Sequence, residues 1–533
     1  MQMLRRRWRP VARTQASAAT TGEVRLAELV AALSLGVDLG FGQPMEHVLR
    51  QCQISLRLAE LRGMSDEDRL VVYYTALLVN VGCHSDAHEQ AKWFGDDISL
   101  RSSKYTYDMR SVRGAAASMR LIGSGNPPLH RFRVGLEFAM RGHRDLDEMI
   151  HTHSEIAQSL ARQLKLDDAV CEAVGASYER WDGKGWPGEL SGEQIPLAAR
   201  LTQLAEYIEV AHRVGGTGAA VALARKRRGS QFDPELATFL CAHADELLSN
   251  LDGTRTWQAV VDAEPALGMR LAGDDIDAAL LAIADFVDLK SPYTLGHARA
   301  VAELVTGAAP QLGMAEDEIR ILRRAALVHC LGRLGVSNSI WDKPGPLGTG
   351  EWERIRMYPY LTERILHQSA ALAPLGQIAV QHRERLDGSG YPRGLSGIAI
   401  SRPARILAAA DAYQSMREPR PYREARTPDD AAGQLRDEVR AGRLDGPSVE
   451  AVLAAAGHRL ARRPDGPARL TDREVDVLRL LARGFSSKEI AARLVIAPKT
   501  ARNHTEHIYA KIGTSNRAGA SLFAVRHGLL AVD

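Results

Sequence analysis

Polar and basic side chains gather in one short stretch near the C-terminal end of this 533-residue chain. Lysine and arginine can meet phosphates or guanine edges, asparagine can pair with adenine, and hydroxyl groups suit either. We therefore interpret the stretch as a contact surface for double-stranded DNA. Its candidate DNA-binding residues are Lys499, Thr500, Arg502, Asn503 and His504, with Lys488 just before them.

The distribution of charge supports the same interpretation. Residues 457–533 contain 14 Lys and Arg against 7 Asp and Glu, a net charge of +7, whereas the whole chain carries +3. The remaining residues therefore sum to −4. Positive charge is concentrated where a polyanion would bind.

Four short helices are predicted to position these side chains. Two capping boxes, each a hydroxyl residue followed three positions later by glutamate, begin the first two helices: Thr471 with Glu474, and Ser486 with Glu489. Pro498 suits the first position of a third helix, which Gly513 can end, and Asn516 leads into a fourth. Two short helices followed by a polar third predict a helix-turn-helix whose third helix lies in the major groove.

The run LTDREVDVLRLLARGFSSKEIAARLVIAPKTARNHTEHIYAKIG closely resembles the LuxR-type DNA-binding domain. The resemblance implies that the third helix reads the operator and that the fourth supports a homodimer. Ala497 stands where the family has a capping serine, and Ala501 replaces the usual valine. Because a lost cap costs about 1 kcal/mol, we expect a different affinity or sequence preference. The alternative is a packed trihelical module that binds protein.

Upstream, the chain contains two copies of one helical pattern. The segment ERWDGKGWPGELSG near Glu179 matches ERLDGSGYPRGLSG near Glu384. Spacing agrees, because His297 to His329 and His47 to Val79 are both 32 residues, and two later intervals are 24 residues in each copy. Only one interval differs, so about 45 residues are inserted in the first copy. The fold class predicted for the whole chain is all-α.

The second copy resembles the HD-GYP domain, through SPYTLGHARAVAELV, AALVHCLGRLGVSNSIWDKPGPL, HRERLDGSGYP and ARILAAADAY. This resemblance implies a helical, metal-dependent phosphohydrolase of the type that opens cyclic di-GMP, in which a pair of ions activates a water. The residues that match the family's metal ligands are His297, His329, His382 and Asp411.

Other metal positions depart from that family. Cys330 stands where the aspartate of the HD pair belongs, Tyr358 and Arg383 replace histidines, and Arg333 replaces a lysine. A guanidinium about 4 Å from a metal ion is repelled by several kcal/mol at an effective dielectric near 20. We therefore expect no two-ion centre. One divalent ion such as zinc or iron, with Cys330 as a possible thiolate ligand, and a metal-free polar core are the alternatives.

The first copy has lost more of these positions. His47, His153 and Glu206 remain, but Val79-Asn80 and Ser177-Tyr178 replace the paired ligands. An apolar valine and a neutral asparagine cannot hold a hard cation. The inserted segment, which includes AHEQAKWFGDDISLRSSKYTYDMRSVRG, is predicted either to cover the core or to line an effector pocket.

These observations predict five parts. They are a disordered basic leader (1–22), a degenerate HD-GYP-like domain (23–265) with an insertion at about 83–140, a second such domain (271–457), a linker (458–469) and a LuxR-type domain (470–533). The sequence contains no run of eighteen apolar residues, so no membrane span is predicted. Five cysteines without a CxxC pair favour a reduced, cytoplasmic protein.

The function predicted from the sequence is a DNA-binding transcriptional regulator. Its HD-GYP-like region is expected to sense a ligand, with a nucleotide as the candidate effector, or to mediate dimerisation. The rival hypothesis is a metal-dependent phosphodiesterase of the cyclic di-GMP type with a DNA-binding tail. A third is a platform that binds another signalling protein through the DGSGYP loop.

Overall fold

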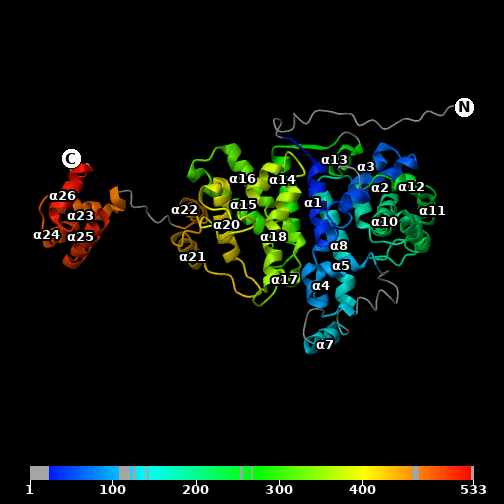
Figure 1. Ribbon diagram of the computed structural model, residues 1–533, viewed down its shortest axis with the longest axis horizontal. Coiled ribbons are helices and arrows are strands. Elements are labelled where there is room, and N and C mark those ends of the chain that lie inside the picture. Colours follow the sequence, from blue (N-terminus) through cyan, green and yellow to red (C-terminus); the bar gives the residue numbers. More distant parts are fainter. Residues whose placement is uncertain are drawn as a thin grey trace. The chain divides into compact units, whose positions relative to one another are not determined.

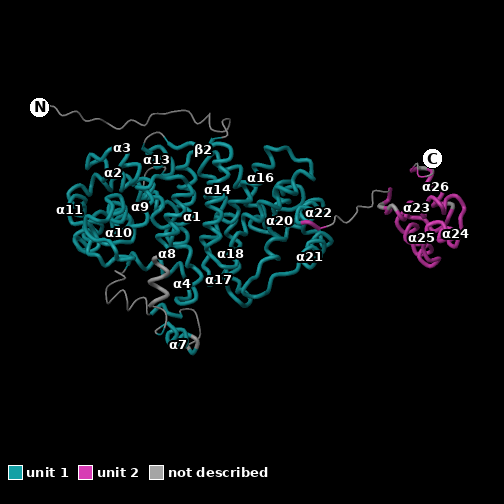
Figure 2. Tube along the Cα trace, turned by 180° about the vertical axis from the view of Figure 1, so that it is seen from behind, with its two compact units in different colours: residues 1–456 teal, residues 457–533 magenta. Residues whose placement is uncertain are grey.

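The computed structural model describes residues 23–106, 120–123, 128–138, 140, 143–251, 256–265, 268–458, 467–527 and 529. The predicted leader, most of the linker and part of the insertion lie outside these residues. The contacts divide the chain into two compact units, residues 1–456 and 457–533 (Figure 2). Helices make up nearly all the regular structure described, which confirms the all-α prediction. The exception is one short antiparallel pair of strands, β1 (Glu23–Arg25) with β2 (Arg270–Ala272).

The first copy in unit 1 follows β1 along the chain (Figure 1). Its helices are α1 (Leu26–Gly40), α2 (His47–Leu61), α3 (Asp66–Leu78), η2 (Val81–His84), α4 (Ala87–Phe94), α5 (Asp97–Ser103), α7 (Pro128–Glu137), α8 (His143–Gln163), α9 (Asp168–Gly175), η4 (Gly192–Gln194), α10 (Leu197–Arg227), α11 (Pro234–Ala242), α12 (Ala244–Leu247) and α13 (Thr256–Asp262).

The second copy follows β2. Its helices are α14 (Asp274–Asp288), α15 (His297–Ala308), η6 (Pro310–Leu312), α16 (Glu316–Val328), η7 (Leu331–Gly335), α17 (Asn338–Trp341), α18 (Thr349–Leu366), α19 (Ala373–Ala379), η8 (Gly397–Ala399), α20 (Arg402–Arg417), α21 (Pro428–Arg440) and α22 (Gly446–Ala455). Helices α5 and α7 of the insertion have no counterpart here, whereas α17 falls at the position of α4.

Matching residues make matching close contacts in the two copies. A Cβ atom on Gly82 would lie 2.1 Å from the His153 carbonyl oxygen, and one on Gly332 would lie 2.1 Å from that of Tyr358. Glycine is therefore required where η2 passes α8 and where η7 passes α18. The carboxylates of Glu179 and Glu384 are both buried, and each accepts backbone N–H groups from the loop that follows it. The repeat predicted from spacing is thus present in three dimensions.

The two copies share one hydrophobic core. Helix α1 of the first copy packs on η7 and α18 of the second, while α14 of the second packs on α8 of the first. Since α18 and α8 occupy equivalent places, these contacts are reciprocal. The antiparallel strand pair, with Val24 opposite Leu271, obeys the same two-fold relation. Unit 1 is therefore built as an internal pseudo-dimer.

Unit 2 contains η9 (Pro467–Arg469), α23 (Asp472–Ala482), α24 (Ser487–Leu494), α25 (Pro498–Ile512) and α26 (Arg517–Arg526) around its own core. Both predicted capping boxes are formed, at Thr471 and Ser486. Gly513 ends α25 with a φ of 68°, a left-handed conformation that favours glycine. Among the described residues, no helix is both long enough and apolar enough to span a lipid bilayer.

Candidate functional site

The four predicted metal ligands converge in the middle of the second copy. His297 begins α15, His329 follows α16, His382 lies just beyond α19, and Asp411 comes from α20. All four side chains are fully buried. The donor atoms of His329, His382 and Asp411 lie within 4.8 Å of one another, as do those of His297, His329 and Cys330. We call this group, with Cys330, the second centre.

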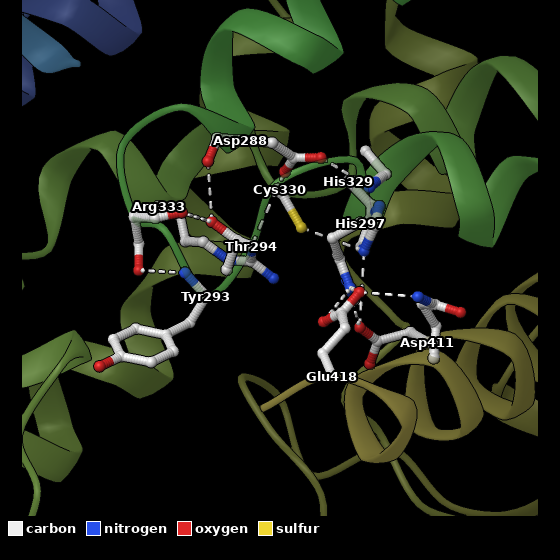
Figure 3. Close-up of polar contacts among 12 residues, drawn as sticks. Asp288, Tyr293, Thr294, His297, His329, Cys330, Arg333, Asp411 and Glu418 are labelled. Carbon is white, nitrogen blue, oxygen red and sulfur yellow. Dashed lines mark hydrogen bonds and ion pairs between the residues drawn. The ribbon is translucent and has the colours of Figure 1, made fainter. Parts of the chain in front are cut away.

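His297 lies between two carboxylates, as Figure 3 shows. Its Nδ1 is 2.9 Å from a carboxylate oxygen of Glu418, and its Nε2 is 3.2 Å from Asp411 Oδ1. Burial opposes the imidazolium charge, but the hydrogen bonds to Asp411 and Glu418 outweigh it and raise the pKa of His297 well above its usual value. Both ring nitrogens therefore carry protons.

His329 faces a thiolate. Its Nδ1–H donates to the Ala326 carbonyl at 2.6 Å, and its Nε2 lies 3.1 Å from Cys330 Sγ. Burial opposes both charges, but the Cys330 sulfur outweighs it and raises the pKa of His329 to about 9. In return, the charges of Arg333 and His329 lower the pKa of the buried Cys330 thiol well below its usual value.

The residues that replace two family histidines form a continuous hydrogen-bond chain with His382. Arg383 Nε donates to the Tyr358 hydroxyl oxygen at 2.9 Å, and that hydroxyl donates to His382 Nε2 at 2.6 Å. Arg383 Nη2 also lies 3.1 Å from Asp411 Oδ2. Burial lowers the pKa of His382 well below its usual value, so its ring is neutral. The lone pair that a metal would need on His382 is occupied by Tyr358.

The arrangement does not fit two metal ions. Arg383 brings a fixed positive charge against the carboxylate of Asp411, and the Tyr358 hydroxyl occupies His382 Nε2. A single ion would bind through His297, His329, Asp411 or the Cys330 sulfur after those groups had released their protons. The donor set therefore fits at most one ion of the zinc or iron type. If one binds, it supplies Lewis acidity at this buried point.

A pocket of about 530 Å³ opens beside the second centre. Five of the described residues that line it are basic and none is acidic, and the His and Asp residues of the centre are not among them. Trp341, Trp352, Tyr391 and Tyr422 supply aromatic rings. Such a pocket suits an anionic ligand with flat rings. Its basic residues are Arg333, Lys343, Arg383, Arg420 and Arg423.

Arg333 is the unusual member of this lining. It is 3% exposed, and none of its three guanidinium nitrogens has a hydrogen-bond acceptor. Its nearest carboxylate, Asp288, lies 3.9 Å away, and burial raises the pKa of that carboxyl to about 7. The guanidinium stacks over the Trp341 ring at 4.7 Å. A buried cation without an acceptor is costly, and an anion in the pocket would relieve that cost.

The first copy holds a lysine where the second holds its centre. Lys104 follows α5 in the insertion and places Nζ 2.7 Å from Glu206 and 2.9 Å from Asn80 Oδ1. Tyr105 donates to the same glutamate at 2.8 Å and lies 3.3 Å from His47 Nε2. Burial opposes the ammonium charge, but Glu206 outweighs it and raises the pKa of Lys104. We call this group the first centre.

Sequence reasoning missed this lysine. Glu206 corresponds to Asp411 and Asn80 to Cys330, so the repeat located the first centre correctly. Lys104, however, lies in the insertion, for which the second copy offers no register. The available signal was a basic residue among aromatic ones in KYTY. His153, the remaining predicted residue, is buried and contacts Asp86 of the insertion.

The predicted DNA-binding residues lie on the surface of unit 2. Lys499, Thr500, Arg502 and Asn503 are exposed on the first two turns of α25, and His504 is half-buried. Lys488 is exposed on α24. Ala501 and Ile508 are buried and anchor α25 to the core of the unit. Arg502 forms an exposed pair with Glu506 at 3.1 Å, which a phosphate would compete for.

Fold and sites together define a tandem HD-domain protein with a C-terminal helix-turn-helix. The family model described as HD domain matches residues 143–236 and 282–447, one segment in each copy. The model of bacterial regulatory proteins of the luxR family matches residues 468–524. Both resemblances stated from the sequence are thereby confirmed.

Proteins similar to this chain include cyclic-dinucleotide phosphodiesterases. The chain is 32% identical to 3'3'-cGAMP-specific phosphodiesterase 3 of Vibrio cholerae over 78% of its own length and 91% of that protein. It is 40% identical to the cyclic di-GMP phosphodiesterase response regulator RpfG of Xanthomonas campestris, over 27% of this chain and 39% of the relative. The crystal structure of a cyclic GMP-AMP specific phosphodiesterase of V. cholerae covers 82% of this chain and 99% of its own, with 28% identity and a TM-score of 0.58. The chain belongs to the HD-domain family that contains these phosphodiesterases.

Proposed function

We propose that this protein is a DNA-binding transcriptional regulator in which the second HD copy binds a cyclic dinucleotide and does not hydrolyse it. The luxR-type unit supports the DNA-binding role. The named substrates of the relatives, 3'3'-cGAMP and cyclic di-GMP, supply the ligand class. Each has two phosphates and two flat bases, which match a cationic, aromatic pocket.

The observation that carries the proposal is the pair Arg333 and Arg383. Both line the pocket, and the fully buried residues of the second centre do not. A phosphate in the pocket would therefore meet guanidinium groups, which bind phosphate strongly but activate no water. The guanidinium nitrogens of Arg333 have no hydrogen-bond acceptor in the protein, whereas Arg383 forms an ion pair with Asp411. A pocket lined by these two arginines therefore binds the cyclic dinucleotide without hydrolysing it.

A phosphodiesterase is the second candidate, because the chain covers nearly the whole of an enzyme that is 32% identical to it. The two candidates differ in metal content and turnover. We expect purified protein to hold at most one metal ion per chain and to leave cyclic di-GMP and 3'3'-cGAMP intact. Two ions per chain, with hydrolysis that His329→Ala abolishes, would establish the enzyme instead.

Ligand binding itself is tested by calorimetry with cyclic di-GMP and with 3'3'-cGAMP on the full chain. Arg333→Gln removes a guanidinium that has no hydrogen-bond acceptor in the protein, and because a charge-assisted hydrogen bond contributes about 1.5–3 kcal/mol, we expect at least a tenfold loss of affinity. Arg393→Gln is the matched control, since that arginine pairs with Glu363 outside the pocket lining. Equal affinity in the two variants would contradict the proposed ligand site.

The DNA-binding role predicts that the protein binds duplex DNA with an affinity that falls steeply as salt increases. Lys499→Ala and Arg502→Ala, both exposed on α25, should weaken binding and reduce the salt dependence. Lys184→Ala, an exposed lysine in unit 1, is the control. Binding that ignores salt, or that the two α25 variants leave unchanged, would favour the protein-binding alternative. The homodimer expected from the luxR resemblance remains part of this proposal.

A further inference from the structure

Helix α5 of the insertion contacts both copies, one at each end. Its last turn leads directly into Lys104 and Tyr105, which fill the first centre. The Lys104 ammonium also lies 4.5 Å from the Phe41 ring centroid, so it is enclosed by a carboxylate, an amide and aromatic rings. An ammonium thus occupies the polar centre of the first copy and neutralises Glu206.

The first residue of α5, Asp97, is fully buried and bonded to the second copy. Its Oδ1 accepts hydrogen bonds from Ser337 Oγ at 2.7 Å and from the Asn338 backbone N–H at 2.8 Å. Its Oδ2 lies 3.3 Å from Lys290 Nζ. These partners lie more than 190 positions away along the chain, and they fix α5 against the start of α17.

We propose that α5 is a latched plug: Lys104 and Tyr105 close the first centre, and the bonds from Asp97 to α17 hold them there. The first centre opens when this latch is released. Helix α17 also contributes Ile340 and Trp341 to the wall of the pocket in the second copy, so the latch is attached to the element that a ligand there would touch. The latch is defined by protein contacts alone, so its test does not depend on the proposed ligand.

The reactivity of a thiol inside the first centre measures whether Lys104 and Tyr105 occupy that centre. Cys83 of η2 is 8% exposed, and its Sγ lies 2.8 Å from the Tyr178 hydroxyl. The Tyr178 ring in turn lies 6.0 Å from the Lys104 ammonium. Release of the plug would therefore expose Cys83 to solvent. Cys241 on α11 is half-exposed and remote from the latch, and Cys52 and Cys171 are buried in the core, so they serve as internal references.

The experiment measures labelling of each cysteine by N-ethylmaleimide in the full chain, resolved by peptide mass spectrometry. In Asp97→Asn, which loses the charge on the latch, we expect Cys83 to react at least tenfold faster while Cys241 is unchanged. Lys104→Met, which removes the plug's cation, should have the same effect. Ser102→Ala is the matched control, because Ser102 lies on α5 and its hydroxyl donates to the Ser99 carbonyl of the same helix, away from the latch.

Ser337→Ala provides a milder change if Asp97→Asn disturbs the whole fold, which labelling of Cys52 and Cys171 would reveal. It removes one hydrogen bond to a charged group, so we expect roughly tenfold faster labelling of Cys83 and unchanged labelling of the core thiols. Unchanged labelling of Cys83 in Ser337→Ala and Lys104→Met would overturn the proposal.

Discussion

At the scale of single residues, charged protein groups face one another across the second centre. His297 and Arg383 are cations on either side of Asp411, and His329 faces the Cys330 thiolate. Burial raises the pKa of Asp411, but Arg383 and the hydrogen bonds from His297 and His329 outweigh it and hold this pKa well below its usual value. Tyr358, Arg383 and Cys330, which replace family ligands, thus each have a bonding partner within the centre.

Arg383 is expected to be essential to stability. Arg383→Met leaves the fully buried Asp411 without its guanidinium, and removal of one member of a buried pair costs about 3 kcal/mol. Denaturant unfolding of the full chain measures the loss. Arg393→Met should cost less than about 1 kcal/mol, because its pair with Glu363 is half-exposed. Equal losses in the two variants would contradict the role assigned to Arg383.

The same centre predicts a pH dependence. Burial opposes the charge of His297, but its hydrogen bonds to Asp411 and Glu418 outweigh burial and raise the pKa of His297 well above its usual value. A raised pKa stabilises the fold fully below pH 6.5, and this contribution is lost as the pH rises toward the folded value. His329 adds no net slope between pH 6.5 and 9, because the proton that it retains in the folded state is offset by the proton that Cys330 has lost there. We expect the melting temperature to fall above pH 6.5, and to fall less in His297→Gln. His367→Gln, at an exposed position, should retain the full decline.

Sequence reasoning located the second centre but not its bonding. The resemblance supplied His297, His329, His382 and Asp411, and the structure brings these four together. The substitutions at Tyr358 and Arg383 were visible as departures, yet nothing in their spacing shows that the two bond each other and occupy His382. Hydrogen bonds between residues on different helices depend on packing, which spacing along the chain does not encode.

At the scale of elements, regular local rules predicted the helices best. The limits of α25, from Pro498 to Ile512 before Gly513, follow from a proline that needs no donor and a glycine that accepts a positive φ. The insertion was the opposite case. The position of helix α5 is fixed by bonds from Asp97 and Lys104 to residues of both copies that lie far along the chain. No local pattern specifies such contacts.

The start of α25 offers a direct test of helix capping. Ala497 occupies the N-cap position with a suitable backbone conformation but has no side chain to accept a hydrogen bond. Ala497→Ser should stabilise the helix by about 1 kcal/mol, measured as slower amide hydrogen exchange in residues 498–512. Ser486→Ala, which removes an existing cap from α24, should change exchange there by a similar amount in the opposite direction. No change in α25 would show that its start is already satisfied in another way.

At the scale of the whole molecule, a compact unit of two HD copies and a luxR-type unit are joined in one chain. The two copies of unit 1 share one hydrophobic core, so we expect them to move as one body. Unit 2 has a separate core and its own caps. Communication between the units therefore has to be measured as a coupling between two binding events, since a regulator requires that one ligand change the affinity for the other.

We expect cyclic di-GMP or 3'3'-cGAMP to change the affinity of the full chain for duplex DNA by at least about fivefold, the lower end of typical allosteric coupling. Linkage requires that DNA change the affinity for the nucleotide by the same factor, so calorimetry with and without DNA provides an internal check. Arg333→Gln should abolish the nucleotide's effect while leaving DNA binding intact, because Arg333 is buried in unit 1. An unchanged DNA affinity at saturating nucleotide would mean that the pocket does not control the helix-turn-helix.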